Sequence, residues 1–221
     1  MTTSFWPTVW TIIRKDLRTE LRARELVNSM LLFSLLSILI FSFALELDRE
    51  ARIEAVSGVL WVTVIYASIL GFNRSLVAEK EQGGLDAMLI APVSRPAIYI
   101  GKLVGNFLFT LIIGLLLLPL MTVLYNISMF SAAIGGLLVL GIFGLAAVGT
   151  LLATMTVQTR SRETLLPIVM MPMALPILQL VVGASLDVLG GYAATGWITL
   201  VFMDGVYLGL GSLLFEYVVE D

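Results

Sequence analysis

The most specific pattern in this sequence lies in residues 74–102, the longest polar interruption of an otherwise apolar chain. Within it, Leu85, Met88 and Leu89 occur at positions i, i+3 and i+4 of a predicted helix and form one apolar stripe about two turns long. Stripes of this kind bind in a groove of another protein. The chemistry indicated is therefore non-covalent docking, although a surface helix resting on lipid headgroups would have the same pattern.

Start and stop signals divide this segment into three parts. Glu79 lies among good helix formers, so the preceding helix is expected to leave the membrane and to end at Gly83 and Gly84. Pro92 then ends the short helix that carries the stripe. A capping serine followed by a proline predicts a new helix from near residue 96. The segment is thus expected to be a structured connection between two membrane helices.

Asp204 is the one acidic residue deep inside a predicted membrane helix. If that helix begins near Gly196, Asp204 lies about 12 Å from its outer end, where an unpaired carboxylate is costly. The side chain must therefore be protonated, paired or hydrated. It is a candidate for a hydrogen bond that locks two helices together or for a polar point on a translocation path, and a re-entrant outer segment would bring it nearer to water.

A second candidate inside the membrane is the helix that contains Pro167, Pro172 and Pro176, with methionines between them. Each proline removes an intrahelical hydrogen bond, so this helix is expected to be kinked or partly unwound. The three prolines are candidates for the wall of a gate. The alternative is a tolerated kink filled by adaptable methionine side chains.

Two of the residue types most often used in covalent and metal chemistry are missing. The chain has no histidine and no cysteine, which excludes the usual catalytic triads, disulfides and iron–sulfur ligation and removes the commonest metal and haem ligand. No phosphate-binding G-x-x-x-x-G-K-[ST] motif occurs. We therefore expect no enzyme, no metal site and no resident cofactor, and any ATP hydrolysis is expected in a partner chain.

The elements that must position these residues are membrane helices. With 59% hydrophobic and 13% charged residues and a mean hydropathy of +1.00, the chain is predicted to be an all-α integral membrane protein forming a single transmembrane domain over 1–221. Six apolar runs have about the length that a bilayer requires. They cover residues 26–45, 55–73, 103–125, 132–157, 165–186 and 196–219.

Residues 5–25 are too charged to cross a membrane but have an amphipathic pattern. One face is predicted to hold Trp6, Trp10, Ile13, Leu17 and Leu21, and another Arg14, Arg18 and Arg22. This pattern is typical of a helix in the headgroup region, anchored by tryptophans. A secretory signal peptide is excluded because the following apolar run is too long and lacks a small-residue cleavage site.

The lysines and arginines predict the orientation. With both termini in the cytoplasm, 11 of the 13 basic residues face inward and only Arg49 and Arg52 face outward. Segment 74–102 and the turn at 158–164 are then cytoplasmic, and the loops at 46–54, 126–131 and 187–195 are external. Two G-x-x-x-G pairs, Gly101 with Gly105 and Gly205 with Gly209, are expected to allow close helix packing.

Four stretches of the sequence carry a resemblance that covers nearly the whole chain. They are ELVNS at 25–29, GVLW at 58–61, EKEQGGLDAMLIAP at 79–92 and LPIVMMPMALPIL at 166–178. In this order on six predicted spans, they resemble the haem exporter B family, CcmB, the membrane subunit of the ABC-type complex of system I cytochrome c maturation.

The resemblance implies an ABC-2-type permease fold, a bacterial inner-membrane location and a homodimer bound to two cytoplasmic ATPase subunits. It also implies a haem-handling membrane protein, a small single-span protein and a periplasmic haem chaperone as partners. Residues 5–25 would be the connecting helix. The coupling helix on the ATPase would comprise the segment around Glu79, Gly83, Gly84, Leu85, Asp86, Met88, Leu89 and Pro92.

The resemblance leaves open what the complex does with ATP. Haem is the substrate implied by the family name, yet release of the periplasmic haem chaperone fits better with a chain whose only haem-ligand candidates are methionine and tyrosine. Two alternatives remain: a membrane scaffold without transport, and an ABC-2 exporter of a lipid or drug.

Overall fold

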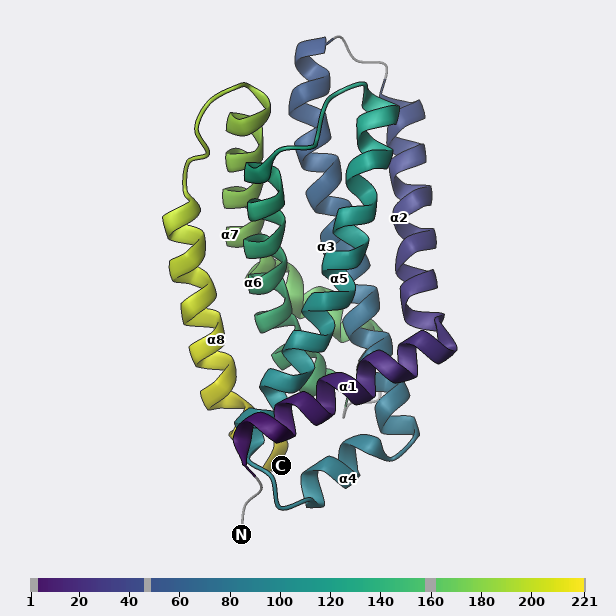
Figure 1. The fold of residues 1–221 in the computed structure, drawn as a ribbon, viewed down its shortest axis with the longest axis vertical. Coiled ribbons are helices and arrows are strands. Elements are labelled where there is room, and N and C mark those ends of the chain that lie inside the picture. The colour runs from purple at the N-terminus through teal and green to yellow at the C-terminus, as the bar shows by residue number, and fades with distance from the viewer. Residues whose placement is uncertain (1–3, 46–48, 158–161, 221) are drawn as a thin grey trace.

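The computed structural model describes residues 4–45, 49–157 and 162–220, and every regular element in these residues is a helix (Figure 1). Most of the turn predicted at 158–164, the start of the 46–54 loop and Asp221 lie outside the described residues. The helices are α1 Phe5–Ala23, α2 Glu25–Ala44, α3 Arg49–Glu81, α4 Gly84–Ile90, α5 Arg95–Tyr125, α6 Ala132–Val157, α7 Arg162–Leu189 and α8 Trp197–Glu220.

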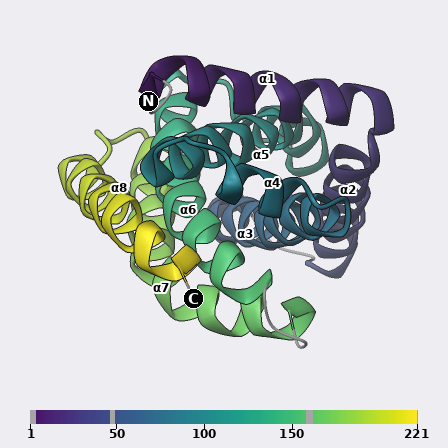
Figure 2. The same ribbon diagram turned by 90° about the horizontal axis from the view of Figure 1, so that it is seen from below.

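Six of these helices, α2, α3, α5, α6, α7 and α8, are long and apolar enough to cross a membrane. Figures 1 and 2 show α1 and α4 at the end of the bundle that also carries both termini. With 33 and 31 residues, α3 and α5 are about 50 and 46 Å long, more than the roughly 30 Å of hydrocarbon. These two helices carry α4 between them.

The centre of the bundle is α6, which packs against α3, α5, α7 and α8. Its glycines let these neighbours come close. A Cβ atom added at Gly141 would lie 2.6 Å from the Trp61 ring and 2.7 Å from Val181, so α3 and α7 occupy the space that a side chain would need. Trp61 is fully buried, and its indole N–H donates to Ser185 Oγ at 2.9 Å. These contacts tie α3, α6 and α7 together.

The two G-x-x-x-G pairs differ in the structure. Gly101 and Gly105 of α5 are buried against α1, where Cβ atoms would lie 2.9 Å from Ile12 and 3.4 Å from Asp16. The predicted close packing is confirmed for this pair. Gly205 and Gly209 of α8 are exposed, and nothing within the described residues lies within 4 Å of their added Cβ atoms.

Two expectations about individual helices need correction. Kinking and partial unwinding were the two outcomes expected for α7, and partial unwinding does not occur, because Arg162–Leu189 is one uninterrupted helix that contains all three prolines. The apolar residues of α1 do not share one environment: Ile13 is buried beside Val9, whereas Trp6 and Trp10 are exposed. The difference arises because α1 lies against α5, which covers only part of its apolar surface.

Candidate functional site

The junction between α3 and α4 has the backbone geometry that its glycines require. Gly83 adopts φ +68°, a left-handed conformation that a residue with a Cβ rarely occupies. Its N–H donates to the Lys80 carbonyl and its own carbonyl accepts the Ala87 N–H, so one residue ends α3 and starts α4. The short helix ends before Pro92, as the sequence predicts.

The side chains of α4 are divided between the core and the exterior. Met88 is half-buried and packs against the core. Ile90, which sequence reasoning did not single out, is 85% exposed. The side chains of Leu85, Asp86 and Leu89 lie outside the part that the structure describes. The rest of the chain therefore leaves Ile90 uncovered.

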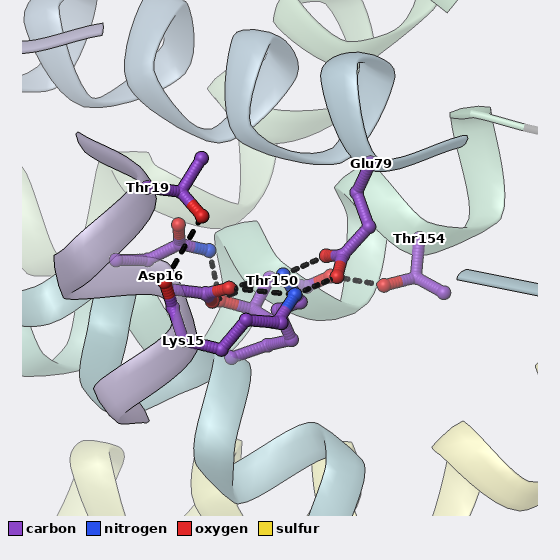
Figure 3. A network of polar contacts seen from close by, with 8 residues as sticks. Lys15, Asp16, Thr19, Glu79, Thr150 and Thr154 are labelled. Carbon is purple, nitrogen blue, oxygen red and sulfur yellow. Dashed lines mark hydrogen bonds and ion pairs between the residues drawn. The ribbon is translucent and has the colours of Figure 1, made fainter. Parts of the chain in front are cut away.

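Next to this junction, four charged side chains from three helices form a closed ring, which we call the ion ring: Lys15, Asp16, Glu79 and Lys102 (Figure 3). Asp16 forms an ion pair with Lys15 at 2.9 Å and accepts a hydrogen bond from Lys102 at 3.0 Å. Glu79 pairs with both lysines. Positive and negative groups therefore alternate around the ring, and its net charge is zero.

Burial of the ion ring is uneven. The side chain of Lys102 is 3% exposed, and those of Glu79 and Asp16 are also largely covered, whereas Lys15 is 44% exposed. A cavity of about 530 Å³, lined by Lys15, Asp16, Glu79 and Lys102 among others, opens beside the ring. Asp16, Glu79 and Lys102 are thus largely enclosed by the bundle, whereas Lys15 is the most exposed member of the ring.

Polar groups of α6 extend this network. Asn106 donates its amide to Thr150 Oγ1 at 2.9 Å, and Thr154 donates to the Thr150 carbonyl at 2.9 Å. Figure 3 shows the Thr154 hydroxyl pointing toward the Glu79 carboxylate. Buried charges require such partners because unpaired ones are expensive in a low-dielectric interior.

Sequence reasoning identified Glu79 but missed its partners Lys15 and Lys102, and it missed Asp16, which pairs with both lysines. One signal was available, since Lys102 lies in a strongly apolar stretch and a buried lysine requires an acidic partner. Its partner Asp16 is 86 residues earlier in the chain. The pairing of two residues so far apart in the chain could not be predicted without knowing that α1 lies along α5.

Asp204 lies inside the bundle rather than on its lipid-facing surface. The residue is 5% exposed, and neither carboxylate oxygen has a hydrogen-bond partner among the described residues. A Cβ atom added at Gly144 of α6 would collide with this carboxylate and would lie 2.9 Å from Ile177 of α7. Three helices therefore meet at Asp204, and Gly144 provides the space for it.

Replacing Asp204 by asparagine is expected to spare assembly but to change activity. The two side chains have the same shape, and the neutral amide avoids the cost of a buried charge. The measurement compares the amount of membrane-inserted protein with its activity in cells. Normal activity in the Asp204→Asn variant would remove this residue from the functional candidates.

The three prolines of α7 differ in exposure. Pro172 is exposed, while Pro167 and Pro176 are half-buried. The buried positions of this helix are occupied by other residues: Leu166, Met170, Ala174, Ile177, Val181, Ala184 and Ser185. Within the described residues, no group of three acidic, histidine or cysteine side chains could hold a metal ion.

Comparison with known proteins places this chain in a family. The family model described as CcmB protein matches residues 7–215. Heme exporter protein B of Rhodobacter capsulatus is 26% identical over 196 residues, covering 88% of this chain and 89% of that protein. The protein of the same name from Bradyrhizobium diazoefficiens is 25% identical, with 84% of each chain covered. With its six helices long enough to span a bilayer, this chain is a multi-pass membrane protein that belongs to the CcmB family.

Proposed function

We propose that this chain is the permease subunit of an ABC-type complex that acts in the haem export step of cytochrome c maturation. Its relatives are named heme exporter protein B, and the similarity extends over most of the chain. The observation that carries the proposal is α4, a short helix held between two long membrane helices, with an exposed isoleucine at its end. Haem is the substrate of the complex in this proposal, and ATP binds to the partner.

The proposed orientation has both termini, α1 and α4 on the cytoplasmic side of a bacterial inner membrane. The distribution of lysine and arginine supports it. In this arrangement α1 is an interfacial connecting helix, with Trp6 and Trp10 exposed to the headgroup region. The chain would then have the layout of an ABC-2-type permease.

The proposed mechanism is mechanical. A cytoplasmic ATPase binds α4 through the segment from Gly83 to Pro92, whereas Glu79 is buried in the ion ring. ATP-driven closure of two ATPase subunits displaces this segment. Because α4 is joined to α3 by Gly83 and to α5 by a few residues, the displacement reaches the membrane helices. The external ends of these helices would change shape, either to export haem or to release the periplasmic haem chaperone. A second copy of the chain completes the complex.

Purification of the intact complex tests this proposal. We expect the tagged chain to co-purify with an ATPase, a second copy of itself, a haem-handling membrane protein and a small single-span protein. Recovery with the haem-handling proteins but without any ATPase would support a static scaffold instead. Recovery of an ATPase that is stimulated by a lipid or drug, and not linked to haem, would indicate an exporter of another substrate.

A further inference from the structure

We propose that the ion ring fastens α1 to both helices that flank α4, so that α1, α3 and α5 move as one rigid unit when α4 is displaced. Asp16 and Lys102 are then positioning residues of the coupling segment. This inference rests on the proposed function, in which α4 receives the force of an ATPase. It assigns to α1 a part in the movement, in addition to its contact with the membrane.

The position of the ring carries the argument. Glu79 lies two residues before the end of α3, and Lys102 lies two turns after the start of α5, so the ring joins the two helices close to α4. Asp16 brings α1 to the same point. Every charge in the ring contacts two opposite charges from its neighbours. A shift of one of the three helices would therefore separate at least two ion pairs.

Apolar contacts along α1 reinforce the same unit. Val9 and Ile13 pack with Ala97 of α5, and Ile12 lies against Gly101. The connection from α1 to α2 is short. It consists of Arg24 alone, which has a left-handed conformation. The Glu20 carboxylate accepts the Val27 N–H at 2.8 Å across this elbow. This short connection therefore transmits a displacement of α1 directly to α2.

Ion pairs are better suited than apolar contacts to holding α1, α3 and α5 in one fixed arrangement. Apolar surfaces can slide past one another because their attraction has no direction. Buried ion pairs contribute little net stability but fix one geometry, since any displaced charge is left without its partner. The side chains of Asp16, Glu79 and Lys102 are each no more than 11% exposed, so little water can replace their partners in the ring. The ring therefore specifies one arrangement of α1, α3 and α5.

A charge-balanced double variant separates coupling from folding. In Glu79→Gln with Lys102→Met, the remaining Lys15 and Asp16 still neutralise each other, but both belong to α1, so the ionic links between helices are lost. We expect normal insertion, ATPase binding and ATP hydrolysis, with cytochrome c maturation per ATP hydrolysed falling about 10-fold. Lys102→Met alone leaves buried acids in excess and is expected to reduce the amount of folded protein. Arg14→Met, an exposed change on α1, is the matched control.

A covalent cross-link between α1 and α5 provides a second test of the rigid unit, because it strengthens their connection instead of weakening it. The chain has no cysteine, so Ile12→Cys with Gly101→Cys introduces a single possible disulfide within it. The two Cβ positions are 2.9 Å apart, so α1 and α5 must separate by about 1 Å to reach the Cβ–Cβ distance of a disulfide, in the reduced and in the oxidised form alike. If α1 and α5 move together, the oxidised variant should retain the maturation rate of its reduced form. Loss of activity on oxidation, with recovery on reduction, would show that α1 moves relative to α5 and would overturn the inference.

Different results would overturn the role of the ion ring and the proposed function. Maturation per ATP at the wild-type value in the double variant would overturn the role of the ion ring and leave the proposed function intact. Absence of an ATPase from the purified wild-type complex would overturn the proposed function itself.

Discussion

Replacing Ile90 by aspartate is expected to lower cytochrome c maturation about 10-fold or more, while the protein remains in the membrane at its normal level. Ile90 is 85% exposed in this chain, so the change removes no internal contact and costs little folding energy. In the proposed complex the same side chain is buried against the ATPase, where an unpaired carboxylate would be desolvated. The effect is measured as the rate of cytochrome c maturation. ATP hydrolysis by the complex and co-purification of the ATPase show whether the contact with the ATPase is lost.

Two variants control for this substitution. Ile90→Leu keeps an apolar side chain of equal size and should retain activity. Gln82→Glu adds a negative charge at another exposed position of the same segment and tests whether charge alone is harmful. If Ile90→Asp binds the ATPase and supports maturation as the wild type does, the contact between α4 and the ATPase must be made by other residues.

Replacing Gly141 by valine is expected to lower the free energy of unfolding by about 3 kcal/mol. The first added carbon atom would lie 2.6 Å from the Trp61 ring and 2.7 Å from Val181, closer than atoms can approach. Trp61 is fully buried and held by its hydrogen bond to Ser185, so it cannot move aside without losing that bond. Thermal unfolding in detergent and the yield of inserted protein measure the change.

Gly136 provides the matched position on the same helix. Nothing within the described residues lies within 4 Å of a Cβ atom added there, and the residue is exposed. Gly136→Val should therefore change the unfolding temperature by much less than Gly141→Val. Equal effects of the two substitutions would mean that valine harms α6 itself and not its packing against Trp61.

The sequence predicted the helices and their ends well because these depend on local signals. Long apolar runs have few structures available in lipid other than helices. The end of α3 at Glu81 and the start of α4 follow from Gly83, whose left-handed conformation suits glycine. The start of α5 at Arg95 is one residue from the expected position. The family was also recognised from short stretches of sequence.

The contacts between distant segments could not be predicted in this way. An amphipathic pattern shows that α1 has an apolar side, but not that α5 covers Ile13 and leaves Trp6 exposed. The proline-rich pattern suggested a kink or partial unwinding because each proline removes a hydrogen bond, yet α7 is not unwound at any of the three. This helix packs against α3 and α6. The partners of Lys102 depend on the same tertiary arrangement.

The central position of α6 also has a consequence for biogenesis. A ribosome completes α2, α3 and α5 before α6, and it completes α7 and α8 last. The close contacts of Gly141 with α7 and of Gly144 with Asp204 of α8 therefore cannot form until the C-terminal part of the chain has been synthesised. Nascent chains that end after α6 would leave one side of that helix open in the bilayer, available to quality-control proteases. Completion of the bundle is thus postponed to the end of translation.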